Sequence, residues 1–152
     1  MKMLFVLTSA TILGVHSCSP GKKAAQDPVE SAHQAGVTLI QATGQRWTAG
    51  IQGGGSGTEY TFKVAINTAT PIQFGTVDLG GKARAVLVAR HGSAISTTLV
   101  VPQQGDTLNL RVSVNNEVIP IAEGATIHYT DNSIAQQLLV PRIEKLAPLS
   151  RP

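Results

Sequence analysis

Apolar and polar residues alternate with a period of two along most of the chain beyond residue 36. In Thr58–Asn67, residues Tyr60, Phe62, Val64 and Ile66 share one face, and Thr107–Asn115 repeats the scheme with leucine and valine. Such alternation is typical of a strand with one buried face. It predicts further strands at Val37–Ala42, Arg46–Ile51, Ile72–Leu79, Ala83–Arg90, Ala94–Val101, Val118–Ile121, Ala125–Thr130 and Gln137–Pro141.

Turn-forming residues separate these segments. The expected turns are Gly80-Gly81, His91-Gly92, Gln104–Asp106, Asn115-Asn116 and Asp131–Ser133. We expect His91-Gly92 and Asn115-Asn116 to form tight hairpins, because their residues tolerate positive φ. Strands at intervals of about 8–12 residues without helical periodicity indicate an all-β fold, an antiparallel β-sandwich that is immunoglobulin-like or related.

The last apolar segment, Ile134–Leu149, leaves two alternatives open. Its leucine and isoleucine residues fit either a short helix or a final strand. Pro141 and Pro148 limit both, because proline lacks the N–H that a helix or a ladder needs.

The N-terminus follows a different pattern. Lys2 precedes Leu4–Val15, which is uncharged and apolar. This segment is shorter than the about 20 residues that a transmembrane helix needs. Residues 1–17 therefore have the organisation of a signal peptide, with a positive start, an apolar centre and small residues at its end.

The only cysteine, Cys18, directly follows this leader in the sequence Val15-His16-Ser17-Cys18. The sequence resembles the bacterial lipobox, although His16 is unusual there. The resemblance implies that the thiol of Cys18 receives diacylglycerol, with palmitate-type acyl chains, and that the chain is cut before it. Several acyl chains give stable membrane anchoring. Ser19 in place of aspartate implies the outer membrane. Ordinary signal cleavage after Ser17 is the alternative.

Composition divides the remaining chain into two parts. Residues 18–36 are rich in Pro, Gly, Lys, Ala and Gln and nearly free of large apolar residues, which indicates a flexible tether. Residues 37–152 then form the β-sandwich domain. The whole chain is 42% hydrophobic and 14% charged, so most of it is not disordered. Its net charge of +3 rests on scattered side chains and gives no basic patch for nucleic acid.

The most distinctive segment is rich in glycine and begins at the only tryptophan. Its characteristic residues are Trp47, Gly50, Gly53, Gly54, Gly55, Ser56, Gly57 and Tyr60. It does not fit a phosphate-binding loop, because it leads into a strand rather than a helix. The segment is similar to that of small secreted or lipid-anchored proteins of Bacteroidetes-type bacteria. That resemblance implies a location and a β-rich fold but no chemistry.

These residues are expected to form either a structural loop or a surface that contacts a partner. For Trp47 there are two possibilities. It either packs over the core or a loop as an anchor, or it contacts a partner.

Candidate catalytic groups are scattered. The histidines are His16, His33, His91 and His128, and no two have metal-ligand spacing. We expect His128 to point outward from a strand, or to be buried with its imidazole hydrogen-bonded. The acidic residues occur singly, and Gly54–Gly57 lacks the strand–helix context of a nucleophile elbow. We therefore expect no catalytic residues, no cofactor and no metal.

These observations favour a non-enzymatic binding or assembly module at the outer membrane. Its expected partners are the membrane, through Cys18, and an envelope protein, but not nucleic acid. Two alternatives remain: a small envelope hydrolase or glycan-processing enzyme with acids from separate strands, and a purely structural envelope protein.

Overall fold

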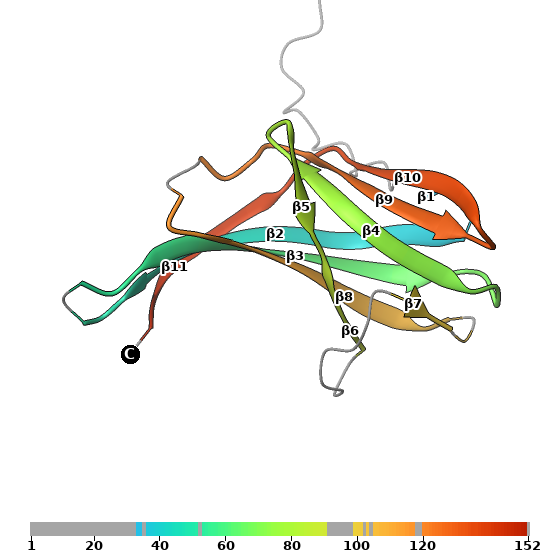
Figure 1. Ribbon diagram of the computed structural model, residues 1–152, viewed down its shortest axis with the longest axis horizontal. Coiled ribbons are helices and arrows are strands. Elements are labelled where there is room, and N and C mark those ends of the chain that lie inside the picture. Colours follow the sequence, from blue (N-terminus) through green and yellow to red (C-terminus); the bar gives the residue numbers. More distant parts are fainter. Residues whose placement is uncertain are drawn as a thin grey trace, which may run out of the picture.

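The computed structural model describes residues 33–34, 36–51, 53–90, 99–101, 103, 105–117 and 120–151. Within these ranges the regular structure consists of strands, which form two packed sheets (Figure 1). The protein is a β-sandwich, as the alternation predicts. Cys18, the leader and most of the tether lie outside the described residues.

The larger sheet, called sheet A, has six strands. Its order is β1 (His33–Gln34), β2 (Val37–Ala49), β3 (Ser56–Ile66), β8 (Thr107–Asn115) and β6 (Leu87–Arg90), and β11 (Glu144–Arg151) also pairs with β2. Because β2 is long, β1 pairs with its start and β11 with its second half.

The smaller sheet, sheet B, has five strands. Its order is β10 (Ile134–Val140), β9 (Ala125–Asp131), β4 (Ile72–Leu79) and β5 (Lys82–Ala85), and β7 (Leu99–Val100) also pairs with β4. The two sheets cross at an angle, and the β2–β3 hairpin extends beyond sheet B (Figure 1).

The core lies between the sheets and is built from the inward residues of each strand. Tyr60, Phe62, Val64 and Ile66 of β3 are fully buried, and the inward leucine and valine side chains of β8 are nearly so. Sheet B contributes Phe74 and Tyr129, whose ring centroids lie 6.0 Å apart. Period-two alternation places all these side chains on one side of their sheets.

Two hairpins of sheet B have two-residue turns with positive φ at both positions. Gly80 and Gly81 join β4 to β5, with φ of 58° and 80°. Asn132 and Ser133 join β9 to β10, with φ of 48° and 67°. This conformation matches the right-handed twist of the strands. The turn predicted at Asp131–Ser133 is confirmed.

Several predicted strand boundaries are wrong. Val37–Ala42 and the first four residues of Arg46–Ile51 belong to one continuous strand, β2, which runs through Gly44 and ends at Ala49. A Cβ atom at Gly44 would lie 2.7 Å from Ile121 Cγ2, so glycine there admits a core side chain. Ala83–Arg90 is divided at Val86, which is buried where the chain passes from sheet B to sheet A. Strands that turn a corner in this way join the two layers of a sandwich.

The predicted hairpin at Asn115-Asn116 is also wrong. Asn116 has a φ of 56° and donates its backbone N–H to Ser56 O, but the chain then crosses to sheet B. Of the strand predicted at Val118–Ile121, Pro120 and Ile121 lie on this crossing rather than in a strand, and the first two residues lie outside the described ranges. Of the strand predicted at Ala94–Val101, the structure describes β7 and the residue after it. His91 and Gly92 lie outside the described residues.

The C-terminal segment Ile134–Leu149 contains neither a helix nor a single last strand, because it is divided between two strands, β10 and β11. Residues 141–143 carry the chain from β10 in sheet B to β11 in sheet A. β11 runs parallel to β2, so the sandwich is not purely antiparallel. A bulge between Leu146 and Leu149 accommodates Pro148. At the other end, β1 pairs with the start of β2, so the sheet begins before the predicted boundary at residue 37.

Candidate functional site

Trp47 lies on the outer face of sheet A, where it pairs with Gly57 of β3. A Cβ atom at Gly57 would lie 2.9 Å from the indole Nε1 and 2.4 Å from Val114 O. Glycine is therefore needed at this position, because the ring on one side and β8 on the other leave no room for a side chain. Trp47 is partly buried and covers Gly57, so it acts as a packing residue on the sheet.

Arg151 holds the other side of the tryptophan. Its guanidinium carbon lies 4.7 Å from the Trp47 ring centroid, and its Nη2 lies 2.5 Å from Glu59 Oε2. The backbone N–H of Gly50 donates to Arg151 O at 2.6 Å. A cation over an indole face is attracted by the negative face of the ring. The last residue of β11 is thus attached to β2, to β3 and to the loop between them.

Two exposed apolar side chains belong to the segments that make this contact. Ile51 is 69% exposed and Leu149 is 44% exposed. Leu149 is in register with Trp47 in the parallel pair of β11 and β2, so both face the same side of sheet A. We call Trp47, Ile51, Leu149 and Arg151 the hairpin tip.

The glycine-rich segment divides between loop and strand. Gly53 has a φ of 79° and open space around it. Gly54 packs closely, since a Cβ atom there would lie 2.3 Å from the Ala49 Cβ. Ser56 and Gly57 already belong to β3. The segment leads into a strand, as predicted.

The structure corrects the grouping of Tyr60 with a loop or contact surface. Its side chain is fully buried, and its hydroxyl accepts a hydrogen bond from Ala122 N at 3.3 Å. Tyr60 therefore anchors the crossing between β8 and β9 and has no surface for a partner. Its inward position on the strand alternation already indicated burial.

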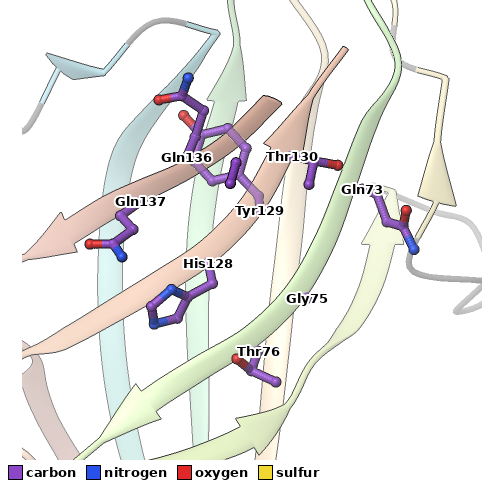
Figure 2. Close-up of a pocket in the computed structure, with 9 residues that line it drawn as sticks. Gln73, Gly75, Thr76, His128, Tyr129, Thr130, Gln136 and Gln137 are labelled. Atoms are coloured by element: carbon purple, nitrogen blue, oxygen red, sulfur yellow. The ribbon is translucent and has the colours of Figure 1, made fainter. Parts of the chain in front are cut away.

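A second candidate surface lies on the outer face of sheet B, over β4, β9 and β10 (Figure 2). It is a shallow groove of about 640 Å³ that is open to solvent. Its lining consists of Gln73, Gly75, Thr76, His128, Tyr129, Thr130, Ala135, Gln136 and Gln137. We call it the sheet B groove. Sequence analysis did not predict this groove, because its residues come from three separate strands.

His128 stands at the middle of this groove, between the strands of Gln137 and Gly75 (Figure 2). Its Nε2 lies 2.9 Å from Asp78 Oδ2, and both side chains are partly exposed. This confirms the expectation of an outward strand residue. The pair is diagonal across β9 and β4, 50 positions apart in the sequence, so spacing along the chain could not reveal it.

Tyr129 lies beneath the groove and is almost fully buried. Burial raises the pKa of its phenol above 10.0, and the nearby charge of Asp131 adds to this effect. The phenol therefore stays neutral at physiological pH. The groove lining includes no carboxylate, and no three His, Cys, Asp or Glu side chains of the described chain come together as metal ligands.

Comparison with protein families, curated proteins and solved structures gives no match to this chain. The described residues contain no helix of the length and apolar character needed to cross a bilayer.

Proposed function

We propose that this chain is an envelope lipoprotein, anchored at the outer membrane by acyl chains on Cys18, and that it acts as a non-enzymatic binding or assembly module. The hairpin tip is the surface that contacts its envelope protein partner. Residues 18–32 serve as the tether between the lipid and the sandwich.

The position of the hairpin tip carries this proposal. The chain enters the sandwich at β1, which pairs with the first residues of β2. The tip lies at the other end of β2, a strand of 13 residues that spans about 40 Å. Figure 1 shows the β2–β3 hairpin and the C-terminal end of β11 at one end of the molecule. A tether at one end directs the other end away from the bilayer.

The chemistry of the tip fits a protein contact. Tryptophan and arginine are the residues most enriched where binding energy concentrates in interfaces. Here they stack on each other beside the exposed side chains of Ile51 and Leu149. The stacking fixes both long side chains before binding, which lowers the entropy that association costs.

The alternatives receive less support. A purely structural protein has no need for an exposed apolar end. The His128–Asp78 pair is the observation that favours a hydrolase, but the lining of the sheet B groove supplies no second carboxylate for acid–base catalysis. Acidic residues of the described chain are otherwise spread over separate turns and strands.

Site-specific photo-crosslinking in native cells tests the proposal. A photoreactive amino acid at Ile51 should give a discrete adduct with an envelope protein. The matched control replaces Lys63, which is also exposed, on the outer face of β3 but far from the tip. Cys18→Ala should abolish the adduct by releasing the chain from the membrane. Equal labelling from positions 51 and 63, or no adduct from 51, would contradict the proposal.

A further inference from the structure

One position of β4 in the sheet B groove, Gly75, carries no side chain. The register of β4 and β9 shifts between Phe74 and Val77, so Gly75 and Thr76 form a bulge opposite His128. A Cβ atom at Gly75 would lie 3.4 Å from His128 O, which is an ordinary contact distance. Gly75 is also absent from the positions with positive φ. Neither close packing nor positive φ therefore demands glycine at position 75, and the missing side chain leaves space beside His128.

The walls of the groove are polar but uncharged. The amides of Gln73 and Gln137 and two threonine hydroxyls line it, together with the imidazole of His128. Gln136, in contrast, pairs with the inward Tyr129 and faces the other side of the sheet. Asp78 holds that imidazole from outside the lining at 2.9 Å. Amides and hydroxyls can both donate and accept hydrogen bonds. The lining contains no lysine, arginine, aspartate or glutamate, so it neutralises no charge on a ligand.

This chemistry distinguishes between classes of ligand. Nucleic acid and anionic glycans require basic residues along their path, and the groove has none. An extended peptide adds to a sheet through its backbone, but β9 at the centre of the groove is already paired with β4 and β10. A neutral oligosaccharide presents closely spaced hydroxyls, each of which needs a side-chain donor or acceptor.

We infer that the sheet B groove binds a neutral oligosaccharide, with the amides of Gln73 and Gln137 and the imidazole of His128 as its hydrogen-bonding groups. Asp78 fixes the orientation of the imidazole and is a positioning residue. No exposed aromatic ring lines the groove, so hydrogen bonds rather than stacking carry the recognition. This activity is separate from the protein contact proposed for the hairpin tip.

The test is amide chemical-shift mapping by NMR on the full-length chain, held in a zwitterionic detergent without a sugar headgroup. The probes are cellohexaose, maltohexaose, xylohexaose, mannohexaose and chitohexaose at millimolar concentration. At least one should shift the amides of β4, β9 and β10 in a saturable manner. Trigalacturonate and a neutral extended pentapeptide should not.

Three variants assign the binding to the groove. Gly75→Val fills it with a branched side chain and should abolish binding without unfolding the protein. Gln137→Ala should weaken binding about two- to tenfold, the range that one neutral hydrogen bond supports. Gln41→Ala removes an exposed amide from the outer face of sheet A and should change nothing. The inference is overturned if no hexasaccharide shifts these strands, if the shifts persist in Gly75→Val, or if the pentapeptide produces the same shifts.

Discussion

The guanidinium of Arg151 lies 4.7 Å from the centroid of the Trp47 ring, and this contact joins the last residue of β11 to the second half of β2. Apart from Arg151, which is partly buried, every residue of β11 is exposed. β11 therefore gains little from burial, and its attachment depends on backbone pairing and on contacts such as this one. Segments with few buried apolar contacts open at lower free energy than the core.

Replacing Arg151 by alanine should release β11 locally. We expect a loss of about 0.5–1 kcal/mol in the free energy of unfolding, the value of an exposed cation–π contact. Hydrogen exchange of the β11 amides should become faster, while β3 and β8 keep their protection. Arg111→Ala, an exposed arginine on β8, is the control and should leave β11 unchanged. Equal protection of β11 in wild type and Arg151→Ala would show that the contact does not hold the strand.

The two ends of the glycine-rich segment should respond differently to alanine. Gly57→Ala places a Cβ atom 2.4 Å from Val114 O and against the indole, so it should cost about 1–3 kcal/mol and displace the Trp47 ring. Gly53→Ala has open space and should cost only about 1–2 kcal/mol of backbone strain without moving the ring. Since Trp47 is the only tryptophan, its fluorescence reports the difference directly. An emission shift of the same size in both variants would contradict this account.

The β9–β10 turn offers a stabilising substitution. Ser133 has a φ of 67°, a conformation that costs an L-residue more than glycine. Ser133→Gly should therefore raise the free energy of unfolding by about 0.5 kcal/mol. This is the strain relieved minus the larger backbone entropy that glycine loses on folding. Thermal or urea denaturation measures the gain. Ser133→Ala keeps the strain and should give none, so a similar gain there would refute the explanation.

Glu117 should make stability depend on pH in the acid range. Hydrogen bonds from Lys82 and then Arg84 lower its pKa below the usual 4.5, and both donor nitrogens lie 2.6 Å from its carboxylate. Because the folded pKa is lowered, the stabilisation is present above the unfolded pKa and is lost as pH falls through the folded value.

We therefore expect Glu117→Gln to reduce stability at neutral pH and to weaken its decline below about pH 4.5. Glu123→Gln, on an exposed site, should follow the wild-type curve. Urea denaturation from pH 2 to pH 7, at steps of about one pH unit, measures how the free energy of unfolding depends on pH. A Glu117→Gln curve parallel to wild type would show that the cluster does not titrate with folding.

Local alternation was sufficient to predict the inward faces of β3 and β8, because one face of each strand is buried and carries apolar residues at every second position. It could not predict β11. Pairing of Leu149 with Trp47 joins positions about a hundred residues apart, and Pro148 weakened the case for a strand. The division of β2 into two predicted strands has a similar cause. Gly44 looks like a break in the alternation, but it is needed for contact with Ile121 from a distant segment.

The candidate site was predictable only where its residues are close in sequence. Trp47 and the glycines stood out as one motif, but the partners that explain them, Arg151 and Val114, carry no local signal. The His128–Asp78 pair and the sheet B groove arise from the register of three strands. Such sites follow from tertiary pairing and become visible only with the fold.

The central claim is that lipid on Cys18 holds the sandwich at the outer membrane, and mass spectrometry of the natural N-terminal peptide tests it most directly. Protein extracted from its native membranes should begin at Cys18, with a diacylglyceryl thioether on the sulfur. A mature chain with a free thiol at Cys18, or one that begins after it, would contradict the anchor and remove the reason for the hairpin tip to face away from the bilayer.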